Sequence, residues 1–164
     1  MNNRKKIFKT GAIVVSSIFL SYMVVEVFKE NFIVAVNTTK SLNDNFYVLK
    51  KTNNIEDIKK GDVFGFTFSK EDSIYYPKGY NFIKYASCLE GEHLLVTEDF
   101  AFCDDRLLTS LARQDKNKNK LTPFLYDGIV PSGKIFASTP YIAGYDSRYW
   151  GFVDKKEILG VSIW

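Results

Sequence analysis

The sequence is poor in the residues on which most metal-dependent and nucleophilic enzymes rely. Its 164 residues include one histidine and two cysteines, which lie too far apart for a metal ligand set. It has no glycine-rich phosphate loop either. The single histidine, His93, has no neighbour that would orient it as a catalytic base, and we expect it at a strand end. The sequence therefore predicts no cofactor, no metal and no histidine-based triad.

The body of the chain also lacks an excess of positive charge. The formal net charge is +3, but Arg4, Lys5, Lys6 and Lys9 all lie within the first ten residues, which hold no acid. The rest of the chain carries 18 basic and 19 acidic side chains. Because nucleic-acid-binding domains carry a clustered basic surface, we expect no nucleic-acid partner.

An uncharged apolar run, Thr10–Val25, follows the basic residues. A membrane-spanning helix needs about 20 apolar residues, and Ile7–Phe28 supplies that length because Lys9 can extend its charge to the interface. Basic flanks stay in the cytoplasm. The sequence therefore predicts a single-pass anchor within residues 1–30 and an extracytoplasmic domain of residues 31–164. A cleavable signal peptide and a buried soluble helix are the alternatives, but no small-x-small cleavage site follows closely.

Beyond the anchor, strand patterns outnumber helical ones, and the 16% aromatic content favours strands. We expect Arg106–Arg113 to form two helical turns, Gln114–Lys120 to be a mobile connection and Gly65 to mark a bulge. The fold class is therefore mainly β, with an N-terminal transmembrane helix followed by an antiparallel β domain. The expected strands are Asn31–Val36, Phe46–Leu49, Val63–Phe68, Asn81–Leu89, Leu94–Val96, Pro131–Ser138, Trp150–Val153 and Ile158–Trp164.

One serine and one lysine stand in contexts that suit nucleophilic chemistry. Ser41 lies in N-T-T-K-S-L and Lys84 in F-I-K-Y-A-S-C-L-E-G. A serine hydroxyl needs a base to take its proton, and where histidine is absent a neutral lysine can serve. If Asn81–Leu89 is a strand, Lys84 shares a face with uncharged side chains alone, and burial there would lower its pKa. The alternative is an ordinary surface lysine. The side chains that share this face belong to Phe82, Ala86 and Cys88.

A third stretch, Tyr145–Val153, reads Y-D-S-R-Y-W-G-F-V. Taken alone, its Asp146 and Arg148 could form a surface ion pair worth about 0–1 kcal/mol. Together and in this order, the three stretches resemble type I signal peptidases, the Ser/Lys family. The N-T-T-x-S-L run, the short chain and Y-D-S-R-Y-W-G are similar to the conjugative-transfer (TraF-type) branch of that family. The resemblance covers, with gaps, residues 37–164.

The resemblance implies a role for each matching residue. Ser41 matches the nucleophile, and Lys84 matches the general base. The Thr39 hydroxyl, with the backbone N–H of Ser41, matches the donors that hold the oxyanion. Asp146 and Arg148 match a pair that supports the catalytic region without taking part in the chemistry.

The chain departs from the family pattern at three positions. Asn43 stands where proline is usual, Glu92 follows Gly91 where aspartate is usual, and Gly144 stands where a serine usually hydrogen-bonds the lysine. The resemblance therefore implies that another group orients Lys84. Ser138, Thr139 and a water molecule are the alternatives.

Cys88 and Cys103 are separated by 15 positions. If the domain lies outside the cytoplasm, its surroundings are oxidising and a disulfide is expected. Two free buried thiols are the alternative.

The function that the resemblance implies is that of a serine endopeptidase in the bacterial inner membrane, with its catalytic domain in the periplasm. It would cleave exported precursors after small residues, with pilin precursors of conjugative transfer as one substrate, and its partners would be such precursors and the lipid bilayer. The acyl-enzyme could be released by water or by an amine. The alternatives are an inactive binding or assembly factor of a secretion apparatus, and a membrane-anchored β domain unrelated to proteolysis.

Overall fold

The computed structural model describes residues 2–71 and 75–163, without the side chains of residues 2–10 and 12. The chain divides into two compact units, Met1–Phe32 and Ile33–Trp164.

The first unit is a single long helix, α1 (Asn2–Asn31). Its apolar side chains from Ile13 to Phe28 are exposed on consecutive positions, so they cover every side of the helix. Among the described residues, no helix is both long and apolar enough to cross a membrane. The anchor expected over Ile7–Phe28 lies partly among side chains outside the described set, as do Arg4, Lys5, Lys6 and Lys9, and it stays a prediction.

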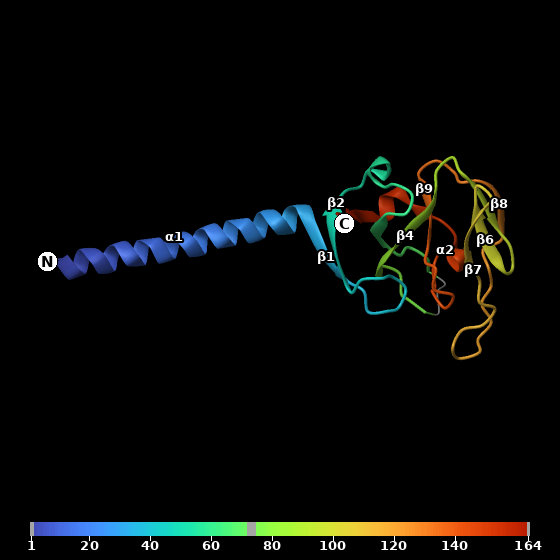
Figure 1. Cartoon of the computed structure of the whole chain (residues 1–164), viewed down its shortest axis with the longest axis horizontal. Coiled ribbons are helices and arrows are strands. Elements are labelled where there is room, and N and C mark those ends of the chain that lie inside the picture. The colour runs from blue at the N-terminus through green and yellow to red at the C-terminus, as the bar shows by residue number, and fades with distance from the viewer. Residues whose placement is uncertain (1, 72–74, 164) are drawn as a thin grey trace. The chain divides into compact units, whose positions relative to one another are not determined.

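The second unit is built on a seven-stranded sheet with the order β1-β2-β11-β3-β4-β9-β10 (Figure 1). The pairings between its neighbours from β2 to β10 are antiparallel, as the sequence predicts. Strands that are far apart in the sequence thus lie side by side: β9 pairs with β4, and β11 pairs with both β2 and β3. The strands are β1 (Phe32–Val36), β2 (Phe46–Lys51), β3 (Val63–Thr67), β4 (Asn81–Leu89), β9 (Lys134–Ser138), β10 (Val153–Asp154) and β11 (Ile158–Ser162).

A four-stranded antiparallel sheet, in the order β7-β6-β5-β8, forms the other end of this unit (Figure 1). Its strands are β5 (His93–Val96), β6 (Phe100–Cys103), β7 (Arg106–Ser110) and β8 (Tyr126–Ile129). The remaining elements are one helical turn, α2 (Ser147–Trp150), and two 3₁₀ turns, η1 (Ile55–Asp57) and η2 (Lys155–Glu157).

The prediction of two helical turns over Arg106–Arg113 is wrong, because that segment contains strand β7. Asp104 and Asp105 have φ of 47° and 61° and form a two-residue turn between β6 and β7. Turns with two positive φ angles match the twist of a hairpin, and aspartate tolerates this conformation. The turn residues, rather than the Leu-Leu pair after them, decide the local structure.

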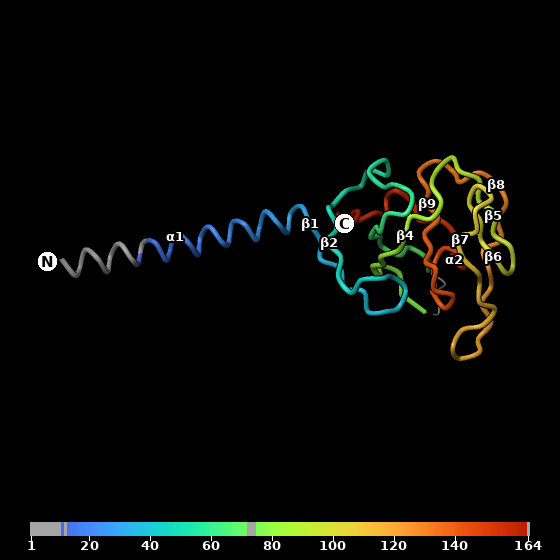
Figure 2. Tube along the Cα trace, in the orientation of Figure 1, coloured from blue at the N-terminus to red at the C-terminus, as the bar shows by residue number. Residues whose placement is uncertain are grey.

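Three smaller expectations also need correction. Residues 114–120 form a hairpin with a bridge between Gln114 and Lys120 rather than an irregular connection, and their mobility stays a prediction. The hairpin can be followed as the gold loop that projects from the domain in Figure 2. The strand expected over Trp150–Val153 is shorter, because Asp146 caps α2 and the chain is helical to Trp150. Gly65 is not itself bulged, since the register shifts in β11, between Ile158 and Gly160.

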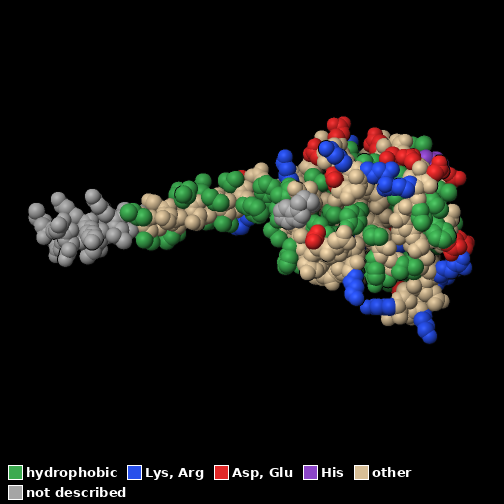
Figure 3. All heavy atoms as spheres, in the orientation of Figure 1, with side chains coloured by type: hydrophobic (Ala, Val, Ile, Leu, Met, Phe, Trp, Pro, Cys, Tyr) green, Lys and Arg blue, Asp and Glu red, His purple; other side chains and the backbone are tan. Residues whose placement is uncertain are grey.

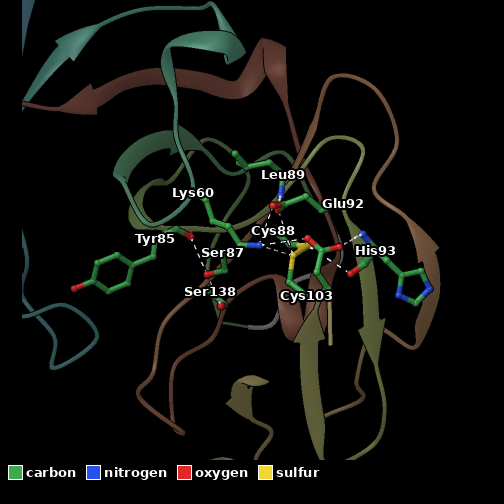
Figure 4. Close-up of a disulfide and its surroundings, with 10 residues drawn as sticks. Lys60, Tyr85, Ser87, Cys88, Leu89, Glu92, His93, Cys103 and Ser138 are labelled. Atoms are coloured by element: carbon green, nitrogen blue, oxygen red, sulfur yellow. Dashed lines mark hydrogen bonds and ion pairs between the residues drawn. A yellow bond between two sulfur atoms is a disulfide. The ribbon is translucent and has the colours of Figure 1, made fainter. Parts of the chain in front are cut away.

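The two larger of the three apolar clusters among the described residues fill most of the domain. One packs Phe64, Phe66 and Phe68 of the large sheet with residues of β9 and β10. The other joins the two sheets, because it combines Cys88 and Phe136 with residues of β5 and β6. Within it a disulfide links Cys88 of β4 to Cys103 of β6 (Figure 4).

Removing this disulfide should lower the free energy of unfolding. The Cys88→Ala/Cys103→Ala variant frees a loop of 15 residues, and such a cross-link contributes about 3 kcal/mol in the chain-entropy model. Thermal unfolding with and without reductant measures the effect. We expect reductant to lower the Tm of the wild type and to leave the Tm of the double variant unchanged. Equal Tm values for the two proteins in the absence of reductant would contradict the prediction.

Candidate active site

A cleft of about 460 Å³ lies in the β domain and is lined by both Ser41 and Lys84. One wall carries Thr39 and Ser41 from the loop after β1, and the strand β4 contributes Lys84. The other walls come from the 114–120 hairpin and the loop between β9 and α2, with several tyrosines. The lining tyrosines are Tyr75, Tyr76, Tyr141 and Tyr145.

Strand β4 places Lys84 on its buried face. Burial alternates along the strand, and Phe82, Ala86 and Cys88 share the face with Lys84, which confirms the sequence prediction. The lysine is 5% exposed, with Nζ 5.6 Å from the centroid of the Phe82 ring. Among the described residues, Lys84 Nζ has no hydrogen-bond acceptor and no ion-pair partner.

The pKa of Lys84 is lowered. Its burial is the main cause, because an apolar setting disfavours the ammonium form. The positive charge of Arg148 lowers the pKa further, while the negative charge of Asp146 opposes the shift. A larger fraction of neutral amine is therefore available near neutral pH than an exposed lysine would provide.

Ser41 is held by a chain of hydrogen bonds within its own loop. Ser41 Oγ lies 2.7 Å from Thr39 Oγ1, and Thr39 Oγ1 lies 3.1 Å from Asn37 Oδ1. Asn37 Nδ2 donates to the carbonyl oxygens of Leu42 and Asp44, which fixes the amide orientation and leaves Oδ1 as an acceptor. Thr39 therefore donates its one hydroxyl proton to Asn37, and Ser41 donates its own proton to Thr39.

The structure thus brings Thr39, Ser41 and Lys84 to one cleft. Ser41 is 5% exposed, and its hydroxyl points its proton at Thr39 rather than at Lys84. Within the described part of the chain no hydrogen bond joins Ser41 Oγ to Lys84 Nζ. The sequence motifs do not indicate that Asn37 orients these hydroxyls. Its place two residues before Thr39, which is the spacing of an Asx turn, is the one signal for it.

Asp146 and Arg148 form an ion pair that is completely buried, unlike the surface pair considered from sequence alone. Arg148 Nε donates to Asp146 Oδ1 at 2.7 Å and Nη2 to Oδ2 at 2.8 Å. The guanidinium also donates to the carbonyl oxygens of Ser110, Tyr141 and Gly144. The pair therefore fixes the end of β7 and the cleft loop between β9 and α2.

Gly144 lies against this pair, where a side chain does not fit. A Cβ at this position would lie 2.6 Å from Thr139 Oγ1 and 2.9 Å from Arg148 Nη2. The hydroxyl of Thr139 thus fills the space that a serine at position 144 would need. Both hydroxyls considered for orienting Lys84 donate elsewhere: Ser138 Oγ to Ser87 Oγ, 2.7 Å away, and Thr139 Oγ1 to Asp146 Oδ2, 3.4 Å away.

The disulfide region holds the one group of ligand-type side chains that the described residues bring close enough for a metal: Cys88, Glu92 and Cys103. The two sulfur atoms are bonded to each other, so they offer no thiolate. Figure 4 shows Glu92 beside Cys103, with an ion pair of 2.8 Å to Lys60. This charge cluster is occupied by its own partners and does not suit a metal ion.

The comparisons with known proteins show the family of the chain. The family model described as signal peptidase, peptidase S26, matches residues 5–164, so the chain belongs to this family. Among solved structures, the chain is similar to a signal peptidase I from Enterococcus faecalis V583, with 20% sequence identity and a TM-score of 0.42. That similarity covers 66% of this chain and 98% of the other. No curated protein matches the sequence.

The family confirms the resemblance to signal peptidases, whereas the TraF-type branch stays a prediction. The roles of Ser41, Lys84, Thr39, Asp146 and Arg148 are likewise predictions. Membership of the family indicates peptidase activity. The proposed catalytic role of each residue rests instead on the contacts and burial described above.

Breaking the buried pair should destabilise the domain strongly. Arg148→Met keeps an unbranched side chain but leaves the Asp146 carboxylate buried without its partner, which should cost about 3–5 kcal/mol. Urea unfolding measures this loss. The exposed pair Arg113–Asp99 provides the matched control, and Arg113→Met should cost less than about 1 kcal/mol. Equal losses for the two variants would contradict the structural role of Arg148.

Proposed function

We propose that the protein is a membrane-anchored serine endopeptidase that removes signal or leader peptides from exported precursor proteins. Ser41 is the nucleophile and Lys84 is its general base. The observation that carries this proposal is the burial of Lys84 with a lowered pKa, on the wall of the cleft that also holds Ser41. Membership of the signal peptidase family supports the same class of reaction.

The reaction requires neutral Lys84, because an ammonium group has no lone pair to accept a proton. Ser41 Oγ attacks the scissile carbonyl carbon while its proton passes to Lys84 Nζ. The intermediate collapses when Lys84 returns that proton to the leaving amine, and an acyl group remains on Ser41. Water, giving its proton to Lys84, then releases the acyl group; an amine in place of water would join two peptide ends.

Thr39 and the Ser41 N–H are the proposed donors to the oxyanion. In the resting site the Thr39 proton is engaged with Asn37 Oδ1. A substrate carbonyl oxygen therefore has to draw the Thr39 hydroxyl away from Asn37. When the Thr39 hydroxyl turns, its lone pairs turn away from Ser41, which weakens this hydrogen bond and makes the Ser41 proton available to Lys84.

Thr139 is the proposed neighbour that orients Lys84 in place of the missing serine. In the antiparallel register, Tyr85 is the partner of Ser138, so the next position places Thr139 opposite Lys84 on the same face. Thr139 is 1% exposed and its hydroxyl lies where a side chain at Gly144 would be. Ser138 is on the other face, which argues against the same role for it.

The proposed location is the bacterial inner membrane, with the N-terminus in the cytoplasm and the β domain in the periplasm. The apolar side chains exposed around α1 from Ile13 to Phe28 support an anchor, because a helix apolar on every side suits an apolar surrounding. Pilin precursors of conjugative transfer are the proposed substrates within the branch that N-T-T-x-S-L resembles.

Ser41→Ala and Lys84→Met should each abolish cleavage of precursor proteins in proteoliposomes, followed by mass spectrometry of the products. Lys84→Met should unfold at a Tm equal to or above that of the wild type, because it removes an ammonium group that burial disfavours. This stability control separates loss of the base from loss of the fold. Full processing by Ser41→Ala would overturn Ser41 as the nucleophile, whereas no processing by the wild type would instead support an inactive binding or assembly factor.

The pH dependence of cleavage should follow Lys84. The group is charged and inactive below its pKa and neutral and active above it, so kcat/KM should rise with pH. Because burial lowers the pKa of Lys84, the midpoint should lie below the ordinary lysine value of about 10.4. A pH–rate profile measures it, with a folding check at each pH. A rise centred at or above the ordinary value would contradict the proposed base.

A further inference from the structure

The 114–120 hairpin forms one wall of the cleft, and the carboxylate of Asp115 organises it. Asp115 Oδ1 accepts from the backbone N–H groups of Asn117 and Asn119, each at 2.8 Å. Asp115 Oδ2 accepts from Asn119 Nδ2 at 2.8 Å and from Tyr75 Oη at 2.9 Å. The hydrogen bond from Tyr75 ties the hairpin to the aromatic wall of the cleft.

The same contacts occupy the one acidic side chain of the hairpin. Burial works to raise the pKa of Asp115, but the hydrogen bonds from Asn119, Tyr75 and Asn117 outweigh it and lower the pKa. The carboxylate is therefore ionised at neutral pH and already satisfied by four donors. Burial and the hydrogen bond to Asp115 raise the pKa of Tyr75 to about 12, so its hydroxyl remains a donor.

Three lysines of the hairpin, Lys116, Lys118 and Lys120, carry uncompensated positive charge. All three are exposed, and none of them has an ion pair within the described part of the chain. Lys118 lies at the tip of the turn with φ 65°, and its backbone N–H donates a hydrogen bond to the Asp115 carbonyl oxygen. Figure 3 shows basic side chains gathered on this projecting part of the domain.

One of these lysines faces the substrate path. Lys116 lines the same cleft as Ser41 and Lys84, and the cleft has no other carboxylate than that of Asp115 among its lining residues. A peptide that follows this cleft from Ser41 to the hairpin therefore meets an unpaired ammonium group. A lysine inside the cleft meets a peptide more readily than it meets a flat membrane surface.

We propose that the 114–120 hairpin is a specificity element that binds acidic side chains of the substrate near the scissile bond. The inference rests on the proposed function and names its substrate class: precursors with aspartate or glutamate close to the cleavage site. Each ammonium–carboxylate contact at such an exposed site contributes little alone, so the selectivity comes from three neighbouring charges together.

The test compares matched peptides that differ only by Asp/Glu against Asn/Gln next to the cleavage site. Full-length Ser41→Ala measures binding by fluorescence anisotropy, and the active protein measures kcat/KM. We expect about tenfold tighter binding of the acidic peptide at low salt, and loss of that preference at about 0.5 M salt because the charges are screened.

The hairpin variant Lys116→Gln/Lys118→Gln/Lys120→Gln should bind both peptides equally. The matched control replaces three exposed lysines outside the cleft, Lys50, Lys155 and Lys156, by glutamine. The control has the same net charge as the hairpin variant and should keep the preference of the wild type. A preference that survives in the hairpin variant, or is lost equally in both, overturns the proposal.

Vesicles of neutral and anionic phospholipid give a second readout. If the hairpin variant loses only its affinity for anionic vesicles while its peptide preference is unchanged, the lysines bind lipid headgroups and the proposal is wrong. The two proposals also fail separately. Selective binding by Ser41→Ala without cleavage by the wild type supports the hairpin's role and overturns the peptidase, whereas cleavage without charge preference does the reverse.

Discussion

The guanidinium group of Arg148 connects the parts of the domain that surround the cleft. It is completely buried and pairs with the equally buried Asp146, and it also donates to carbonyl oxygens at Ser110, Tyr141 and Gly144. A buried charge that loses a partner costs several kcal/mol, so these segments are stable only together. The strand, the loop and the helical turn that meet there are each short, and the shared cation holds them in one arrangement.

The same pair sets the electrostatic surroundings of Lys84. The negative charge of Asp146 and the positive charge of Arg148 act on the lysine in opposite directions, so burial remains the main cause of its lowered pKa. A buried active site needs charged groups that make it rigid and a lysine that can lose its proton, and these two requirements conflict. The ion pair provides rigidity next to the cleft, and its two charges partly cancel at the lysine, so that burial decides the direction of the pKa shift.

The sequence predicts the local arrangement well where one face of an element is buried. The alternation in β4 follows from the apolar residues around Lys84, and the structure has it residue for residue. The sequence predicts less where a turn decides the outcome. The Asp104–Asp105 turn makes a hairpin of a segment that resembles a helix, and the hydrogen bonds of Asp115 order a run whose composition is typical of a mobile loop. Such contacts depend on side-chain direction, which composition does not contain.

The site shows the same limit. The residues that belong to the cleft can be identified from short runs and a family resemblance, but not the hydrogen bonds between them. Asn37 determines the direction of the Thr39 and Ser41 hydroxyls, and Thr139 fills the space beside Gly144. Both effects arise from distances between atoms that the loop and the sheet register bring together, and neither has a distinct pattern in the sequence.

The central claim is that Lys84 is a neutral base beside Ser41. The most direct measurement is the titration of its side chain by NMR, with ¹³Cε-labelled lysine and Lys84→Met to assign the resonance. We expect one resonance whose midpoint lies well below the midpoints of the other lysines and which disappears in the variant. A Lys84 resonance that titrates together with the exposed lysines, near the ordinary value of about 10.4, would contradict it.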